Sequence, residues 1–434
     1  MTEVYVLNRN LERIGVVDNY TSLIWANRYS DIGDCELYVY ATVELLKILK
    51  KNHYLVREDD DMVCRIETIE IDTDVENGNY LIVTGYDCKK ILNQRVIWGQ
   101  TNADGNVEDY IRDIVYKSLV NPALPERAIR NADGRQNFLL GAKAGFTEVT
   151  TEQTSYKQVG EKVQEFCKLY QWGYKVIVDN DNFYFSLYKG ADRSNSVIFS
   201  NDFENLISTK YREDSSSLGN VALVAGEGIG SNRSRNVSGY AESLDRYEIY
   251  VDARDISRTI TWGDLIKMYP TTDNGGHGHI SEFQQSFYYV MNFIDIQIVD
   301  DNQLAELQSA YPSGQVFKKD GIKYYRAYNV IIADLTSNSP AENDSVTLRD
   351  VIYSVYLLSC GYDKLSEYGT VVSFEGSIEP DVTFVYKQDY FLGDLVTVEN
   401  EYGISRKARI VEVVETNDEN GYNIEPKFEY IEVN

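Results

Sequence analysis

The sequence has few of the residues that build metal, disulfide and linker structures. Of its 434 residues, 3 are histidine, 5 are cysteine and 7 are proline, with 29 glycines and no low-complexity linker. The cysteines are an odd number, lie far apart and include no CxxC pair, which indicates neither a disulfide framework nor a zinc knuckle. We therefore predict reduced thiols that serve as packing residues. They are Cys35, Cys64, Cys88, Cys167 and Cys360.

Basic residues and long apolar runs are also scarce. Lys and Arg number 42 against 68 Asp and Glu, which gives a formal net charge of −26. Nucleic-acid binding needs cationic side chains that displace counterions, so this charge argues against stable nucleic-acid binding. No run approaches the roughly 20 apolar residues that cross a bilayer, and the opening lacks the basic and apolar regions of a signal peptide. We expect neither a membrane-spanning segment nor Sec export.

Apolar and aromatic residues are plentiful enough for folded cores. Hydrophobic residues make up 43% of the chain and aromatics 12%, with 35 Tyr and 15 Phe. At roughly 150 residues per domain, the length predicts about three domains. Alternating apolar residues predict a small β-barrel or sandwich in the first hundred residues, with a short helix at 43–50 and a tight turn at Asn77 and Gly78. The expected strands are 3–7, 13–17, 36–40, 54–57, 63–71 and 80–84.

Helical spacing replaces the strand pattern from about residue 100. Asn106 is expected to cap a first helix, and Ser155 with Gln158 to form the capping box of a second. We expect the second helix to pack on a hairpin of strands 174–178 and 183–188. Its apolar stripe is Tyr156, Val159, Val163, Phe166 and Tyr170.

Strands return after residue 200, and a less regular stretch at 257–344 interrupts them. The pattern Thr347-x-x-Asp350 is expected to start a third helix as its capping box. The strands expected in this half are 206–211, 220–225, 245–251, 371–376, 384–386, 395–398, 408–415 and 425–431. The sequence thus predicts two β blocks, 1–99 and 196–256 with 370–434, an α+β domain at 100–195, and an inserted α+β region at 257–369.

Two loops, one rich in glycine and one with two histidines, contain residue types found in binding sites. Gly226, Gly228 and Gly230 follow an expected strand, but their GxGxG spacing and the lack of a following apolar helix favour a hairpin or loop over a dinucleotide site. His277 and His279 could hold a transition metal near Asp273. Their glycine-rich flanks and the lack of an identifiable third ligand favour an exposed polar loop.

Carboxylate clusters at 58–61, 72–76 and 179–181 match neither a calcium loop nor the convergent carboxylate pair of a glycosidase. We expect them to be solvated turns. The chain also lacks HExxH, GxSxG and GxxxxGK[ST]. We therefore predict that the protein is not an enzyme, and assign no catalytic, cofactor-binding or metal-binding residue.

Several segments resemble the tail proteins of long-tailed, non-contractile phages and their prophages. They are NLISTKY at 205–211, NVALVAGEG at 220–228, LDRYEIYVDARD at 244–255, SFEG at 373–376, YFLGDLVTV at 390–398, ARI at 408–410, YTSLIW at 20–25 and GDCEL at 33–37. The resemblance implies a tail-tip or baseplate hub, similar to the hubs of contractile tails and to the N-terminal part of tail-associated lysins.

Such hubs are trimers in which each chain contributes two barrel-like β domains to a ring. The fold class implied is therefore α+β, mostly β. The implied partners are two further copies, the distal tail or tail-tube protein, the tape-measure protein, and tail fibres or a receptor-binding protein. The chain is then made in the cytoplasm of the bacterial host and resides at the virion tail tip.

The resemblance also gives the acidity a role, because a lumen lined by carboxylates would let the genome pass without binding it. An alternative of a different class is a secreted or cell-surface carbohydrate-active hydrolase or binding module. That alternative also accounts for strands, acidity and tyrosine, and it predicts an aromatic-floored cleft with paired carboxylates.

Overall fold

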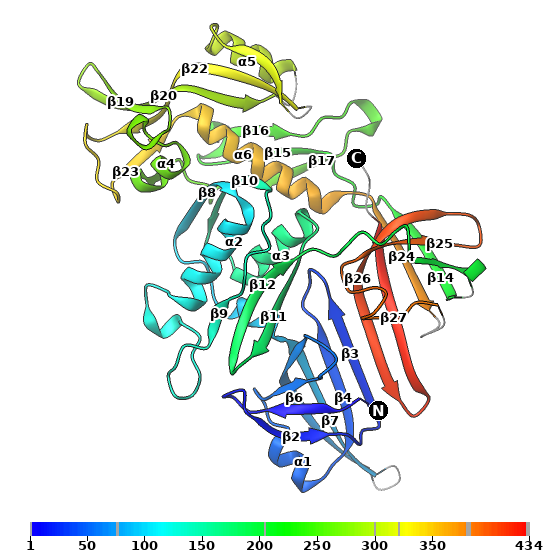
Figure 1. Ribbon diagram of the computed structural model, residues 1–434. Helices are drawn as coiled ribbons and strands as arrows, with labels where there is room; N and C mark the ends of the chain where they lie inside the picture. Colours follow the sequence, from blue (N-terminus) through cyan, green and yellow to red (C-terminus); the bar gives the residue numbers. More distant parts are fainter. Residues whose placement is uncertain are drawn as a thin grey trace.

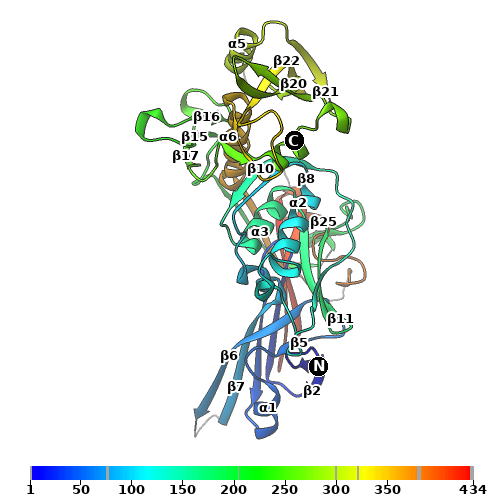
Figure 2. The ribbon, with the colours of Figure 1, turned by 90° about the vertical axis from the view of Figure 1, so that its left-hand side faces the viewer.

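The computed structural model describes residues 2–74, 78–203, 205–298, 301–319, 322–378 and 383–430. The expected turn residue Asn77 and the cluster residue Glu76 lie outside these ranges. The fold is mostly β, as predicted, with a short α-helix in the first block and the other described α-helices between residues 107 and 365. Figures 1 and 2 show an elongated molecule, with the first β block at one end and the inserted region at the other.

The first block contains the strands and the helix that the sequence predicts. Its strand order is β3-β4-β7-β6-β5-β1-β2, and every neighbouring pair is antiparallel. Alternate residues face a core that includes Trp25, Leu37 and Val83. The elements are β1 Val4–Leu7, β2 Arg13–Val17, β3 Ser22–Arg28, β4 Asp34–Tyr40, α1 Val43–Ile48, β5 Tyr54–Val56, β6 Val63–Asp74 and β7 Gly78–Asp87.

A disulfide joins Cys35 of β4 to Cys64 of β6, so the prediction of reduced thiols is wrong for these two residues. Strand β7 lies between their strands, and its Gly85 pairs with Cys35. A Cβ on Gly85 would lie 2.8 Å from the Cys64 sulfur, so the bridge needs the space that glycine leaves. The pairing depends on the register of three strands, which the cysteine spacing does not reveal.

The α+β domain confirms one predicted helix cap and contradicts the other. Asn106 caps α2, and its side-chain oxygen accepts a hydrogen bond from the Asp109 amide at 2.9 Å. Ser155 instead ends a strand, Tyr156 is exposed at a φ of 55°, and the second helix begins only at Val159. The elements are β8 Gln100–Asn106, α2 Val107–Val115, β9 Phe138–Leu140, β10 Val149–Ser155, α3 Val159–Leu169, β11 Gly173–Asp179 and β12 Asn182–Tyr188.

The first β block and most strands of the last one, β13, β14 and β24 to β27, form one sheet, which the sequence does not predict. Strand β26 pairs with β3 from Glu412 opposite Arg28 to Asp418 opposite Ser22, and this pairing creates a 13-stranded sheet. Its main path runs from β14 to β2 without returning on itself among the described strands. The further strands are β13 Ile198–Ser200, β14 Leu206–Asp214, β24 Val371–Ile378, β25 Leu395–Glu399, β26 Ser405–Asp418 and β27 Gly421–Tyr430. The expected strand at 384–386 is only an isolated bridge between Tyr386 and Tyr390.

The inserted region forms a six-stranded sheet whose core is shared with a neighbouring three-stranded sheet, β16-β15-β17. The third predicted helix is α6 Asp350–Leu365; Thr347 lies in the preceding strand and does not cap it. The other elements are β15 Val221–Ala225, β16 Arg235–Ser238, β17 Glu248–Asp252, β18 Thr259–Thr261, α4 Trp262–Met268, β19 Gly278–Phe283, β20 Ser286–Gln297, α5 Asp301–Ala310, β21 Gln315–Lys319, β22 Ile322–Leu335 and β23 Ser345–Leu348.

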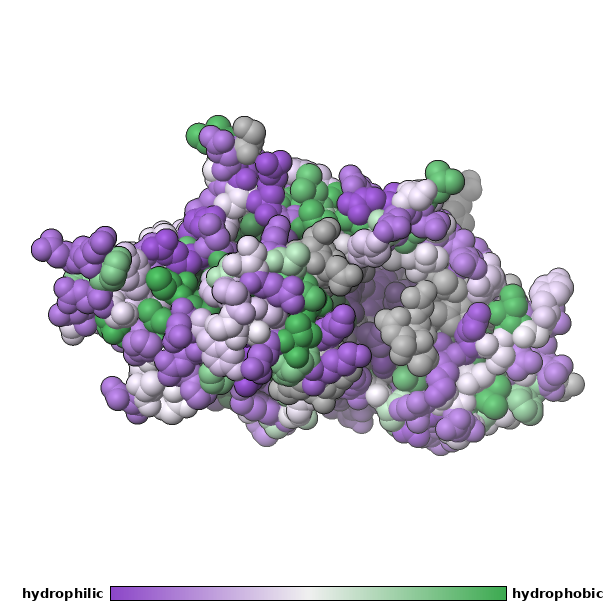
Figure 3. Space-filling model, turned by 90° about the horizontal axis from the view of Figure 1, so that it is seen from above, coloured by the Kyte–Doolittle hydropathy of each residue, from purple (hydrophilic) through white to green (hydrophobic). Residues whose placement is uncertain are grey.

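Seen from the end that carries the inserted region, the surface is largely hydrophilic, with hydrophobic residues in separate patches (Figure 3). In the described part of the chain, no helix combines the length and the apolar character that crossing a bilayer requires.

Candidate functional site

Three parts of the chain meet around a cavity of about 510 Å³. The loop 58–62 of the first block forms one wall, the ends of β11 and β12 form another, and residues 386–394 of the last block form the third. Tyr29 crosses this junction: its ring lies where Cβ atoms on Gly173 and Gly393 would collide with it, and its hydroxyl lies 3.1 Å from the Gln171 carbonyl oxygen. The cavity therefore lies at the joint where the first block, the α+β domain and the last block pack together.

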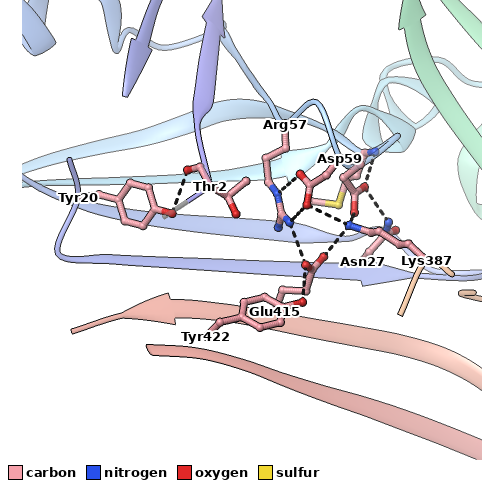
Figure 4. Close-up of polar contacts among 10 residues, drawn as sticks. Thr2, Tyr20, Asn27, Arg57, Asp59, Lys387, Glu415 and Tyr422 are labelled. Carbon is pink, nitrogen blue, oxygen red and sulfur yellow. Dashed lines mark hydrogen bonds and ion pairs between the residues drawn. The ribbon is translucent and has the colours of Figure 1, made fainter. Parts of the chain in front are cut away.

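A buried ionic cluster joins the first block to the last one beside this cavity (Figure 4). The Arg57 side chain is 3% exposed, and its Nη2 lies 2.9 Å from Oε2 of Glu415, which is 5% exposed on β26. Lys387 Nζ lies 3.0 Å from the other oxygen of Glu415 and 2.7 Å from Asp60. Arg57 Nε also donates to Asp59 at 2.9 Å. Side chains thus reinforce the joint that the β3–β26 backbone pairing makes.

The environment of the cluster favours the charged form of its members. Burial alone would lower the pKa of Arg57, but its hydrogen bond to Asp59 and the charge of Glu415 outweigh burial and raise that pKa. Burial alone would raise the pKa of Asp59, yet the bond and charge of Arg57 hold it below its usual value. The pKa of Lys387 is likewise raised, because the charges of Asp60 and Glu415 outweigh its burial. The cluster thus keeps Arg57, Asp59 and Lys387 in their ionised forms.

In the carboxylate cluster 58–61, Glu58, Asp59 and Asp61 are exposed as the predicted solvated turn requires, and only Asp60 differs. The Asp60 side chain is 2% exposed, and its Oδ1 accepts hydrogen bonds from the Met62 amide at 2.7 Å and from Asn27 at 3.2 Å. Asp61 is exposed and pairs with Lys175 of β11 at 2.7 Å. The partners of Asp60 and Asp61 come from other parts of the chain, so the local sequence does not indicate that Asp60 is buried. The cluster at 179–181 is the exposed hairpin turn that the sequence predicts.

A second charged pair lies in the wall of the cavity, and sequence reasoning missed it. Asp87 and Lys89 are each 2% exposed, with Lys89 Nζ 3.5 Å from Asp87 Oδ2 and 3.2 Å from the Asp31 carbonyl oxygen. Burial raises the pKa of Asp87 and lowers that of Lys89. Asp394, also on the cavity wall, pairs with Arg193 at 2.7 Å. The carboxylates around the cavity are thus engaged in internal pairs, an arrangement that suits a structural joint.

The glycine loop and the two histidines lie away from this joint. Gly226 begins the turn of the β15–β16 hairpin, as predicted, and a Cβ there would lie 2.4 Å from the Tyr353 hydroxyl of α6. His277 and His279 are exposed, and the His277 ring lies 4.4 Å from that of Phe293. In the described ranges, no three His, Cys, Asp or Glu side chains gather as metal ligands would.

The joined sheet has one face turned away from the core, which we name the acidic sheet face. Cross-strand neighbours point to the same side of a sheet, and three neighbouring rows on this face contain no Lys or Arg among the described residues. The rows are Asp72, Tyr80 and Tyr40; Glu70, Ile82, Tyr38, Ser22 and Asp418; and Thr84, Glu36, Ile24 and Thr416. Glu70 and Asp72 are exposed. Carboxylates and tyrosines therefore dominate this surface.

Comparison with known proteins gives one family and several similar folds. Residues 3–428 match the family described as siphovirus ReqiPepy6 Gp37-like protein. A tail protein from Neisseria meningitidis is 10% identical, with 99% of this chain and 97% of that chain covered and a TM-score of 0.48. The 43 kDa tail protein of prophage MuSo2 from Shewanella oneidensis is 9% identical, with 98% of each chain covered and a TM-score of 0.48. A prophage tail protein from Listeria monocytogenes is 9% identical, with 100% and 96% covered and a TM-score of 0.44. No curated protein sequence matches the chain.

Proposed function

Because the chain belongs to the siphovirus ReqiPepy6 Gp37-like family, a family of phage tail proteins, we propose that it is the hub of the tail tip or baseplate. In this role three copies form a ring that ends the tail tube and opens for genome passage. The ring contacts the distal tail or tail-tube protein and the tape-measure protein, and the inserted region contacts fibres or a receptor-binding protein. The role needs no enzymatic activity.

The observation that best supports this proposal is the joined sheet with its buried ionic cluster. A ring around a passing genome needs rigid segments, and backbone pairing together with a buried charge cluster gives the two β blocks a fixed relative position. We propose that the strands of the joined sheet act as the two barrel-like units of each subunit, one from 1–99 and one from β13, β14 and β24–β27; β15–β17, which the sequence places in the second unit at 196–256 with 370–434, share the core of the inserted region instead. The α+β domain 100–195 and the inserted region 257–369 then face outward or toward the tip.

The acidic sheet face is the candidate lining of the channel. Carboxylates repel a phosphate backbone over about 8 Å at physiological salt, which is enough to act close to a channel wall. A lining without Lys or Arg in its central rows allows DNA to slide past without counterion release, the source of most non-specific DNA affinity. DNA passage is then transient, and the protein has no stable nucleic-acid complex.

Electron microscopy of the purified oligomer and antibody labelling of virions test the proposal. We expect a three-fold ring with a central opening in particle images, and labelling confined to the distal end of the tail. A protein that purified virions lack would contradict the tail assignment. A closed ring of another symmetry would contradict the trimer while leaving the tail assignment intact.

The cavity lends some support to the alternative, a carbohydrate-active module, because Tyr188, Tyr386 and Phe391 line it together with carboxylates. The pairing of Asp59, Asp60 and Asp394 with cations argues against it, since a glycosidase needs an acid free to transfer a proton. Calorimetric titration with bacterial cell-wall oligosaccharides tests this alternative. Saturable binding that is lost in a Tyr386→Ala variant would favour the carbohydrate module over the hub.

A further inference from the structure

A small basic and aromatic patch lies where the first block, 1–99, continues into the α+β domain; it consists of Arg95, Trp98 and Arg127. The Arg127 guanidinium stacks over Trp98, with its central carbon 4.4 Å from the ring centroid. Trp98 is 57% exposed. Arg95 Nε donates to the Arg127 carbonyl oxygen at 2.6 Å, and Arg127 Nη2 donates to the Val96 carbonyl oxygen at 2.5 Å. These bonds fix the positions of both guanidinium groups, and we name the three side chains the Arg95–Trp98–Arg127 patch.

The charges of this patch are not balanced by carboxylates. Among the residues that the structure describes, no carboxylate lies within ion-pair distance of Arg95 or Arg127, whose side-chain hydrogen bonds all go to backbone carbonyl oxygens. Burial lowers the pKa of both groups, and the charge of Arg95 lowers that of Arg127 further. Several guanidinium N–H donors are left for an external acceptor.

The surroundings add further positive charge. The same loop carries the exposed Arg130 and Arg135. Together with Arg95 and Arg127 they make four cations, against the two exposed carboxylates Glu126 and Asp133. The net charge of the chain is −26, so most of its remaining surface is acidic. This cationic patch is therefore complementary in charge to the acidic surface of a second copy. Arginine and tryptophan are also the side chains that most often dominate interface energies.

We propose that the Arg95–Trp98–Arg127 patch is a subunit contact that receives carboxylates from a different surface of a second copy of this chain. The inference rests on the proposed oligomeric hub. A contact between two different surfaces is heterologous, and such contacts close into a ring when the rotations between successive copies add up to one full turn. The incoming carboxylates accept the unused guanidinium donors in a bidentate geometry, while Trp98 is covered by the neighbouring copy.

Variants of the patch test the contact by sedimentation velocity over a concentration series. Arg127→Gln and Trp98→Ala are each expected to raise the dissociation constant of the oligomer at least about tenfold. The matched control is Arg246→Gln, which removes an exposed arginine that pairs with Glu248 on another part of the chain. Added salt should weaken the wild-type oligomer more than the Arg127→Gln oligomer. Equal dissociation constants for wild type and both variants would overturn the proposal.

Fluorescence of the unaltered protein gives a second test that needs no variant. Of the 4 tryptophans, Trp25 and Trp172 are 0% exposed and Trp262 is 7% exposed, so Trp98 dominates quenching by acrylamide. We expect quenching to fall as the protein associates. Association with unchanged quenching, or a chain that stays monomeric at its highest soluble concentration, would refute the contact. Protection of Trp98 by short duplex DNA but not by self-association would also refute it, in favour of a nucleic-acid occupant.

These outcomes are separable from failure of the hub itself. A three-fold ring in which Trp98 remains fully quenchable refutes the patch as a contact but leaves the hub standing. Absence of the protein from virions refutes the hub, whatever the patch does in solution.

Discussion

At the scale of single residues, the joint between the two β blocks depends on partners that are remote in sequence. Arg57 and Glu415 are separated by 358 positions, and neither local sequence distinguishes them from surface charges. Glu415 is surrounded by Arg57, Lys387 and the Tyr422 hydroxyl, all within hydrogen-bonding or ion-pair distance. Removing its charge would leave two cations without their shared partner.

We expect Glu415→Gln to lower the free energy of unfolding by about 3 kcal/mol, because breaking a buried pair leaves uncompensated charge. Urea denaturation followed by circular dichroism measures the change. Glu425→Gln on the exposed side of β27 serves as the control and should change the free energy by less than about 0.5 kcal/mol. Equal effects of the two variants would mean that the cluster contributes no more than surface charge.

The same cluster predicts how stability depends on pH. The pKa of Asp59 is below its usual value of 3.8 in the folded protein, so its contribution is fully present above that pH and is lost as pH falls through the lowered pKa. We expect the urea concentration at the unfolding midpoint to decrease as the pH is lowered below about 4. In Asp59→Asn this decrease should be less steep. A variant whose midpoint follows the wild-type curve throughout the acid range would contradict this assignment.

The disulfide provides a further test at this scale. Reduction of the Cys35–Cys64 bridge, or Cys35→Ser, should lower the free energy of unfolding by about 3 kcal/mol, because the bridge closes a loop of 29 residues in the unfolded chain. Denaturation with and without reductant measures this difference. The Cys35→Ser/Cys64→Ser double variant controls for the other thiols, since reductant should then have no effect; a persisting effect would point to another bridge.

At the scale of elements, the sequence predicts segments well and their partners poorly. Alternation predicts β4 and β7, and the Asn106 cap predicts the start of α2, because each depends on residues within a few positions. The pattern Ser155-x-x-Gln158 fails because β10 pairs with β8 as far as Ser155, so tertiary pairing outweighs local capping. The pairing of β3 with β26 joins Arg28 to Glu412 across 384 positions, and no local pattern encodes it.

The packing of α6 on the β15–β16 hairpin is testable through its glycine. Gly226→Ala would place a Cβ 2.4 Å from the Tyr353 hydroxyl and disturb its bonds to the Glu227 amide and the Ile256 carbonyl oxygen. We expect a loss of about 1–3 kcal/mol in the free energy of unfolding. Gly369→Ala, where the added Cβ meets no atom within 4 Å, is the control. A destabilisation no larger than that of the control would show that the hairpin can move away from α6.

At the scale of the whole molecule, composition gave the charge but not its distribution. The net charge of −26 fits either a channel lining or an evenly solvated surface. The sheet register shows that part of this charge is concentrated, because it places Glu36, Glu70 and Asp72 on one face together with Tyr38 and Tyr80. The candidate site was only partly predictable for the same reason: the cluster at 58–61 is visible in the sequence, whereas its cationic partners are supplied by folding.

If the acidic sheet face lines the channel, its charge can be inverted to capture DNA inside the ring. The triple variant Glu36→Lys, Glu70→Lys and Asp72→Lys should bind linear duplex DNA. The logarithm of its binding constant should fall with the logarithm of the salt concentration with a slope of about −3 or steeper, as three phosphate contacts per subunit require. Wild type should not bind. A control with lysines at the exposed Asp181, Asp202 and Asp255 has the same net charge change, so it separates position from net charge.

The topology of the DNA distinguishes a lumen from an outer wall. A cross-linked ring of the triple variant can admit a linear duplex through its opening, but a covalently closed circle has no end to thread. We therefore expect gel-shift binding of linear DNA and none of relaxed circular DNA of the same sequence. Equal binding of both forms would place the face on the outside of the ring, and the repulsion of DNA by that face would then have no role in genome passage.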